Sequence, residues 1–200
     1  MKTYFTLIKI SQTALLAISI LMLATLPGGI VLYPNYVNND LLYFLAHTSL
    51  FLVMIVRPLA DLMPGVIFVR PLVILRKGMG VFSAAIIVSF ILAKIIIDPV
   101  GYLSDFGTTA YWSMTNLALL AHLADISAVL LLVTSNNLSK RLMGPWWKRL
   151  QKLSYVYFYG SGLYVVFSYQ DIIVLDYMIV VTVLTLMAYI VKTKKEVVTS

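Results

Sequence analysis

Long apolar runs separated by short polar breaks make up this chain, and this pattern constrains its fold more than any other feature. The breaks contain turn-forming residues, such as Pro34-Asn35, Pro64-Gly65 and Asp98-Pro99. Six runs are long enough to form helices that cross a membrane, at roughly residues 10–32, 41–60, 79–97, 110–134, 152–169 and 172–191. The pattern predicts an all-α integral membrane protein, a six-transmembrane-helix bundle in which residues 1–200 form a single transmembrane domain.

Composition excludes several other classes of protein. Hydrophobic residues make up 61% of the chain and charged residues 12%, whereas soluble domains contain about 45–50% and about 25%. The chain has no cysteine, which excludes disulfides, iron–sulfur clusters, thiolate metal sites and thiol catalysis. No P-loop, dinucleotide-binding fingerprint, zinc-protease motif or nucleophile elbow is found. We therefore expect no metal site, and no catalytic residue is predicted.

The charged residues alternate between the two sides of the predicted bundle. Of the 15 Lys and Arg residues, all except Lys94 fall on one side, as the following set shows: Lys2, Lys9, Arg57, Arg70, Arg76, Lys77, Lys140, Arg141, Lys148, Arg149, Lys152, Lys192, Lys194 and Lys195. Cytoplasmic loops accumulate Lys and Arg, so we expect both termini to be cytoplasmic, in a bacterial-type cytoplasmic (inner) membrane. The net charge of +7 then reflects topology, and no nucleic-acid partner is expected.

The first apolar run also resembles a secretory signal, because Lys2 and Lys9 precede the apolar stretch 14–26. The run continues through Leu32 without a small-x-small cleavage site. We therefore expect this segment to be retained as the first helix.

Ionisable side chains inside a bilayer are costly, so each of them is a candidate for function. His122 and Asp125 are three residues apart on the fourth predicted helix and share a face. A carboxylate beside an imidazole orients it as in metal-bound or haem-bound histidines, but a buried polar pair that satisfies itself is the simpler interpretation. His47 lies on the second helix, and Lys94 is expected to reach towards Asp98 one turn later.

The depths of the two histidines differ. By helix rise, His47 is expected roughly 9 Å from the outer surface and His122 roughly 16 Å, near the middle of the membrane. This offset disfavours the two histidines as opposite ligands of one haem.

A Gly160-Ser161-Gly162 step lies among tyrosines on the fifth predicted helix. Small residues allow two membrane helices to approach closely. We interpret this step as a packing contact in preference to a notch for a cofactor.

Three sequence segments carry a resemblance to a known family. They are residues 134–151, Arg57-Pro58-Leu59-Ala60, and Leu75-Arg76-Lys77-Gly78-Met79-Gly80. Together they resemble the ferric-reductase-like transmembrane domain family, and within it the MsrQ (YedZ) group of haem-binding membrane subunits. The likeness extends over about residues 43–168. It implies six helices and b-type haem held by histidines on the third and fifth helices.

This chain has no histidine at the positions of the family's haem ligands. When the chain is aligned with the family on Gly80 and Trp147, those positions fall on Phe90, Gln151 and Tyr164. Phenylalanine offers no ligand atom, an amide is a weak ligand, and tyrosine ligation belongs to a different kind of haem site. The resemblance therefore implies a scaffold whose haem ligands are missing, with no cofactor expected besides lipids.

A haem-less bundle of this kind is expected to be a structural or accessory subunit of a larger membrane complex, in respiratory or photosynthetic electron transport. Its partners would be other integral membrane protein subunits and the lipid bilayer. Two alternatives stay open. One is an electron-transfer subunit of an MsrPQ-like or ferric reductase system that binds haem b or another tetrapyrrole through His47 or His122. The other is a small transporter that uses His122, Asp125 and Lys94, which would need a water-filled cavity around Asp125.

Overall fold

The computed structural model describes residues 2–114 and 117–199, and every regular element in these ranges is a helix. The longer helices are α1 (Lys2–Leu32), α2 (Asn39–Leu62), α4 (Leu75–Ile97), α6 (Ala118–Thr134), α9 (Leu153–Tyr169) and α10 (Ile172–Thr199). The shorter ones are α3 (Val69–Leu72), α5 (Pro99–Asp105), α7 (Asn137–Met143) and α8 (Pro145–Leu150). The predicted all-α class is confirmed. The side chains of Lys2 and Lys195, which enter the charge pattern, lie outside the described part.

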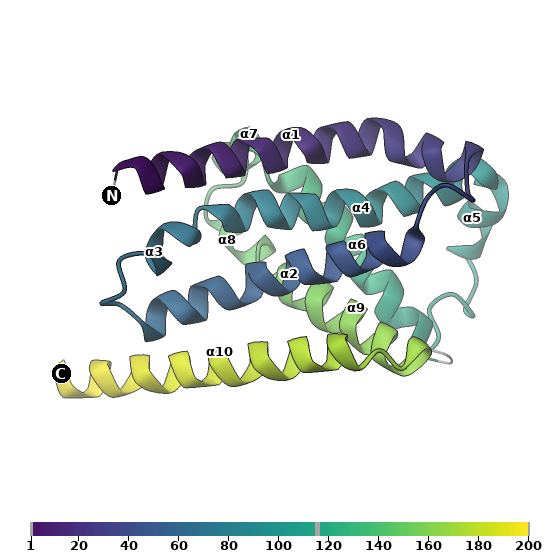
Figure 1. The fold of residues 1–200 in the computed structure, drawn as a ribbon. Helices are drawn as coiled ribbons and strands as arrows, with labels where there is room; N and C mark the ends of the chain where they lie inside the picture. The colour runs from purple at the N-terminus through teal and green to yellow at the C-terminus, as the bar shows by residue number, and fades with distance from the viewer. Residues whose placement is uncertain (1, 115–116, 200) are drawn as a thin grey trace.

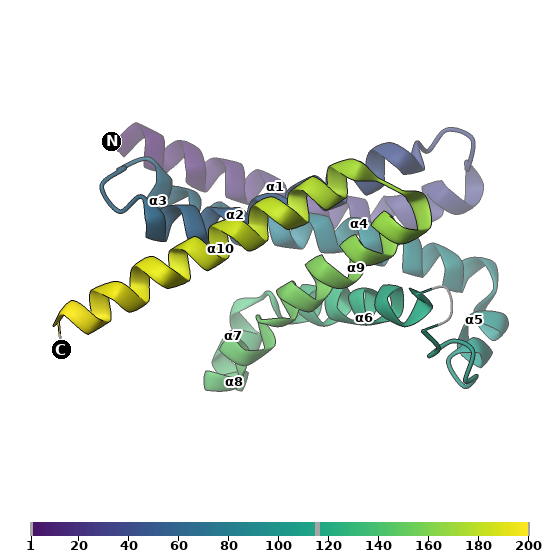
Figure 2. The same cartoon turned by 90° about the horizontal axis from the view of Figure 1, so that it is seen from below.

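The helices form two layers. In the first, α1, α4, α2 and α10 lie next to one another in that order, and each packs on its neighbour (Figure 1). In the second, α6 and α9 pack on each other, α6 against α4 and α9 against α10 and α2 (Figure 2). Helix α1 therefore forms one edge of the bundle and α10 the opposite edge.

Polar breaks cap the helices, as their sequences predict. The side chain of Asn38 accepts a hydrogen bond from the backbone N–H of Leu41 at the start of α2. Asn136 does the same for Ser139 at the start of α7, and Asp98 for Gly101 at the start of α5. The structure shows no ion pair between Asp98 and Lys94 in the described ranges, because the carboxylate caps α5 instead.

The predicted start of the fourth membrane helix, at residue 110, is wrong. Helix α6 begins at Ala118, and the prediction also covers residues 115–116, which lie outside the described part. In the preceding turns the indole N–H of Trp112 donates to the carbonyl of Phe106, and the Thr108 hydroxyl accepts from the N–H of Tyr111. Such side-chain bonds compete with helix formation. Leu117, with φ +57°, then sets the new direction of the chain.

Four helical segments are long and apolar enough to cross a membrane, within the part of the chain that the structure describes. They are Thr3–Leu32, Asn39–Leu62, Val69–Ile97 and Ile172–Lys194. Helix α6 with α7 makes a fifth if this pair, which is bent by 96°, counts as one span. Helices α6 and α9 have 17 residues each, which is about 25 Å of helix against a hydrocarbon core of about 30 Å. The described part of the chain is therefore a helical bundle whose long apolar helices are compatible with a membrane.

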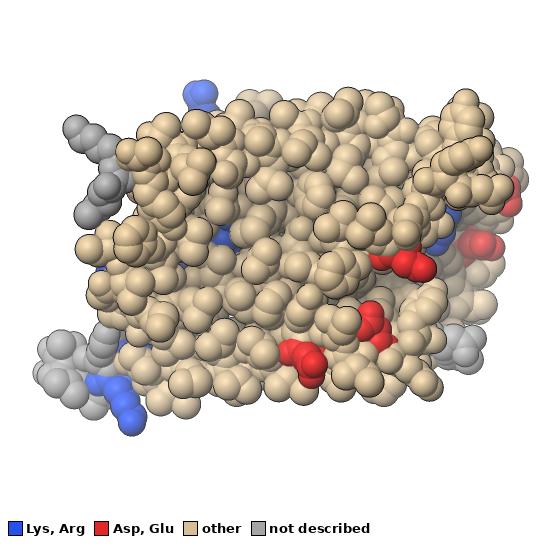
Figure 3. Space-filling view, viewed as in Figure 1, with Lys and Arg blue, Asp and Glu red and all other residues tan. Residues whose placement is uncertain are grey.

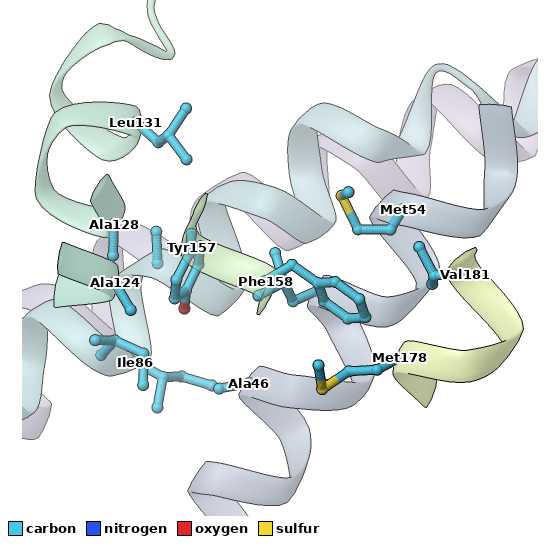
Figure 4. Close-up of a cluster of buried hydrophobic side chains, with 13 residues drawn as sticks. Ala46, Met54, Ile86, Ala124, Ala128, Leu131, Tyr157, Phe158, Met178 and Val181 are labelled. Carbon is cyan, nitrogen blue, oxygen red and sulfur yellow. The ribbon is translucent and has the colours of Figure 1, made fainter. Parts of the chain in front are cut away.

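The bundle interior is apolar and draws on both layers. Close to its centre, Tyr157 and Phe158 of α9 lie among side chains of α2, α4, α6 and α10 (Figure 4). The fully buried Ile86 and Val181 come from α4 and α10. Helix α1 contributes no buried member to this cluster, which agrees with its place at the edge.

The two ends of the bundle differ in charge. The N-terminus and the C-terminus lie at the same end (Figure 1). On the face seen in Figure 3, the acidic side chains lie mostly towards the opposite end and the basic ones mostly towards the termini, and the surface between them carries few charges. This is the polarity that the alternating sequence charges predict.

Candidate functional site

His47 is buried in α2 with one ring nitrogen left without a partner. Its side chain is 9% exposed, and its Nδ1 lies 2.9 Å from the backbone carbonyl oxygen of Tyr43, one turn earlier. A carbonyl only accepts hydrogen bonds, so Nδ1 carries the proton and donates. Nε2 then presents a lone pair, and it is buried with no hydrogen-bond partner among the residues that the structure describes. Metal-bound histidines are oriented by this kind of Nδ1–H bond.

Phe90 of α4, which the resemblance aligns with a haem ligand, is stacked on Tyr43 of α2. The two ring centroids are 4.5 Å apart and the ring planes differ by 4°. This places the phenylalanine one helical turn of α2 away from His47. The position is filled by aromatic packing between α2 and α4, which stabilises the pair of helices.

The other two positions that the resemblance aligns with haem ligands are Gln151, before α9, and Tyr164, within it. Gln151 lies at the junction of α8 and α9, where its backbone N–H donates to the carbonyl of Trp147. Its side-chain Nε2 is buried and has no hydrogen-bond partner in the described part of the chain. Tyr164 lies on α9 and meets Tyr169 edge-on, with centroids 6.2 Å apart. From Leu153, the first residue of α9, to Tyr164 is about 17 Å of helix, so the side chains of Gln151 and Tyr164 do not lie at the same level of the bundle.

His122 lies close to the start of its helix, and not halfway along it. Because α6 begins at Ala118, His122 is about 6 Å of helix from that end. Its ring stacks on Tyr111, with centroids 3.4 Å apart and planes 9° apart, and meets Trp112 edge-on at 6.4 Å. Burial raises the pKa of the Tyr111 phenol above its ordinary range. The imidazole is therefore packed against a neutral aromatic group at the acidic end of the bundle.

His122 and Asp125 do not form a hydrogen bond or an ion pair in the described part of the structure. Both side chains are half-buried, and they share the face of α6 that their spacing predicts. Within the same ranges, no group of three or more His, Cys, Asp or Glu side chains is arranged to hold a metal ion.

The glycine step on α9 is confirmed as a packing contact. A Cβ on Gly160 would lie 3.1 Å from the backbone carbonyl oxygen of Leu120 in α6, and one on Gly162 would lie 2.7 Å from Sδ of Met178 in α10. The two glycines thus bring α9 close to two different helices. Beside them, the hydroxyls of Ser83 and Tyr157 form a buried hydrogen bond of 2.9 Å between α4 and α9.

Sequence reasoning missed two features of this region. It did not pair His47 with Tyr43, although a spacing of four residues in a helix is the signal for a side chain that bonds to the carbonyl of the preceding turn. It also did not predict the stack of Tyr111 on His122, because that contact depends on the turns between α5 and α6.

No protein-family model, curated protein or solved structure matches this chain. The resemblance to the ferric-reductase-like family therefore rests on the three sequence segments.

Proposed function

We propose that this chain is a haem-less, ferric-reductase-like membrane protein that acts as a structural or accessory subunit of a larger membrane complex, such as a respiratory or photosynthetic electron-transport complex. The observation that carries the proposal is the stack of Phe90 on Tyr43. In this chain two packed aromatic rings occupy the position at which a member of the family would hold the haem iron. A scaffold that keeps the bundle but loses the ligand is suited to assembly.

The surface of the two edge helices supports a role in assembly. In the described part of the chain, helix α1 packs mainly on α4 and touches α3. It exposes large apolar side chains along its length, including Leu7, Ile10, Ile20 and Leu21. Helix α10 exposes another apolar set. In a membrane these surfaces meet lipid or other helices, so the partners we propose are integral membrane proteins, with no nucleic acid involved.

The topology we propose has six crossings, with both termini in the cytoplasm of a bacterial-type inner membrane. In this arrangement α6 and α9 are the fourth and fifth crossings. They are short, and a bilayer accommodates a short helix by thinning locally. The basic residues at the end that carries both termini support the orientation.

The experiment is purification in mild detergent, followed by an absorption spectrum and mass spectrometry of the intact complex. We expect no Soret band and a stoichiometric integral membrane partner. A monomeric preparation with a Soret band and reductase activity would overturn the proposal.

A second candidate function is electron transfer through haem b or another tetrapyrrole, and the unpartnered Nε2 of His47 favours it. The donor fits a metalloporphyrin, because a neutral imidazole with its Nδ1–H bound to a carbonyl presents its lone pair at Nε2. When bound, such a group would supply a one-electron couple, and His47 would hold its metal. His122 is the only other histidine of the sequence, and it is packed on Tyr111.

The two candidates are distinguished by titrating the purified protein with haem. Under the first proposal the wild type and His47→Ala give the same spectrum as free haem in detergent. A Soret shift that disappears in His47→Ala and persists in His122→Ala would establish the second.

A small transporter is the less favoured alternative. The pocket of about 470 Å³ described below is lined by α2, α4 and α10 and the loops at the terminal end, and Asp125 is not among its lining residues.

A further inference from the structure

A pocket of about 470 Å³ lies at the end of the bundle that carries the two termini. Its walls come from the last turns of α2, the segment around α3, the start of α4 and the final part of α10. The final part of α10 is distant in sequence from the other walls and meets them at the left of Figure 1. The pocket is separate from the histidines, which lie nearer the acidic end.

Four basic side chains line this pocket and one acidic side chain accompanies them. The basic ones are Arg57, Arg70, Arg76 and Lys192, and the acid is Asp61. Nε of Arg57 lies 3.9 Å from Oδ2 of Asp61, and the two side chains are 69% and 59% exposed. Such a long, solvated pair is weak. The three arginines alone therefore give the pocket an excess of positive charge over Asp61.

Arg76 is held in place by the helix that it faces. Its Nε–H donates to the backbone carbonyl of Val53 in α2 over 2.9 Å, and the side chain is half-buried. Arginine has five N–H donors, and this is the single hydrogen bond from Arg76 in the described part of the structure. A guanidinium that is fixed in this way is suited to bind phosphate oxygens with its remaining donors.

The remaining walls of the pocket are aliphatic. They include Ala60, Val73, Ala188 and Val191, which lie beside the basic groups. A free phosphate ion gains nothing from apolar walls. A phospholipid carries a phosphate next to a glycerol and acyl chains. Its phosphate can bind the cationic side chains while its glycerol and acyl chains contact the apolar wall beside them.

We propose that this pocket is a binding site for a phosphate ester anion, and that its ligand is an anionic phospholipid of the leaflet at the terminal end. The phosphate lies among the arginines, and the glycerol and the first acyl carbons lie against the aliphatic wall. The inference stands apart from the proposed function, because it depends on neither haem nor a protein partner.

The test is a lipid titration of the full-length protein in neutral detergent, followed by native mass spectrometry. Phosphatidylglycerol and phosphatidylcholine are compared on the wild type, Arg57→Gln, Arg70→Gln and the double variant. Because each basic group near a membrane surface contributes about fivefold to binding, we expect each single variant to weaken phosphatidylglycerol binding about fivefold. The double variant should lose roughly 25-fold, with phosphatidylcholine unchanged.

Arg141→Gln is the matched control. Arg141 is an exposed arginine of α7, so its substitution removes the same charge outside the pocket, and we expect less than a twofold change. An equal loss in Arg141→Gln would mean that overall charge attracts the lipid, which would overturn the site. So would equal binding of the two lipids by the wild type.

A third arm separates the two sources of phosphate. Inorganic phosphate is added to the phosphatidylglycerol complex, and we expect displacement only at concentrations far above those of the lipid. Tight binding of inorganic phosphate to the wild type, without a preference for phosphatidylglycerol, would overturn the lipid as the ligand. Arg76 is left unchanged throughout, because its bond to Val53 also supports the fold.

Discussion

Individual small residues set how closely the helices of the second layer approach. Gly160 is the clearest case, because its missing side chain leaves only 3.1 Å between an ideal Cβ position and the Leu120 carbonyl oxygen. A backbone atom cannot move aside as a flexible side chain can. The packing of α6 on α9 therefore depends on this glycine.

Replacing Gly160 with Leu should force α6 and α9 apart. We expect a loss of about 1–3 kcal/mol in the free energy of unfolding, as for other overpacked interiors. Thermal unfolding in detergent, followed by circular dichroism, measures it. Gly28→Leu is the matched control, because nothing lies within 4 Å of a Cβ at Gly28, and it should change stability by less than about 0.5 kcal/mol. Equal losses in the two variants would contradict the packing role of Gly160.

The buried hydroxyl pair is a second test at the residue scale. Tyr157→Phe removes the bond to Ser83 while it keeps the ring, so we expect a loss of about 0.5–1.5 kcal/mol. Tyr155→Phe is the control, since Tyr155 is 43% exposed and should tolerate the change. Urea unfolding of both variants checks the difference, and an unchanged Tyr157→Phe would show that the bond does not contribute to stability.

How far the site could be predicted differs from residue to residue. His47 stands out in the sequence as an ionisable group in an apolar run, and its Nδ1–H bond follows from helix geometry. The stack of Phe90 on Tyr43 joins two helices, so no local pattern indicates it. The position of His122 along its helix was mispredicted, because it depends on where α6 begins.

At the scale of helices, the sequence predicted the ends that polar caps fix. Asn38, Asp98 and Asn136 each stop or start a helix where the apolar runs break. Two starts were missed. Helix α1 begins at Lys2 and not at residue 10, because charge alone does not stop a helix. Helix α6 begins at Ala118, because hydrogen bonds of Thr108 and Trp112 hold the preceding residues in turns.

Whether the short helices cross the membrane is tested by cysteine labelling, and the chain itself has no cysteine to interfere. Thr109→Cys lies in the turns that precede α6, Leu138→Cys lies in α7 directly after it, and Tyr169→Cys marks the end of α9. All three positions are exposed. Under six crossings, an impermeant maleimide added to intact cells should label Thr109→Cys and Tyr169→Cys but not Leu138→Cys. Labelling of all three would show that α6 does not cross, and the bundle would then have fewer spans.

At the scale of the whole molecule, charge polarity ties together the orientation and the lipid pocket. Both termini lie at one end of the bundle (Figure 1), and so do Arg57, Arg70 and Arg76, which line the pocket. Moving basic groups across a membrane is costly, and the cytoplasmic leaflet is anionic. The three arginines would therefore help to fix the orientation of the protein in the membrane, and they would lie in the leaflet that contains the anionic lipid bound by the pocket.

Fusions to the C-terminus test this orientation in bacterial cells. We expect a green fluorescent protein fusion to fluoresce and an alkaline phosphatase fusion to be inactive, because the first folds in the cytoplasm and the second needs disulfides that form outside it. As a control, alkaline phosphatase inserted after Thr109 should be active. An active C-terminal phosphatase would place the basic end outside. The arginine pocket would then face the outer leaflet, and its lipid ligand would have to come from that leaflet. This outcome would contradict the orientation, which was inferred from the retention of basic residues on the cytoplasmic side.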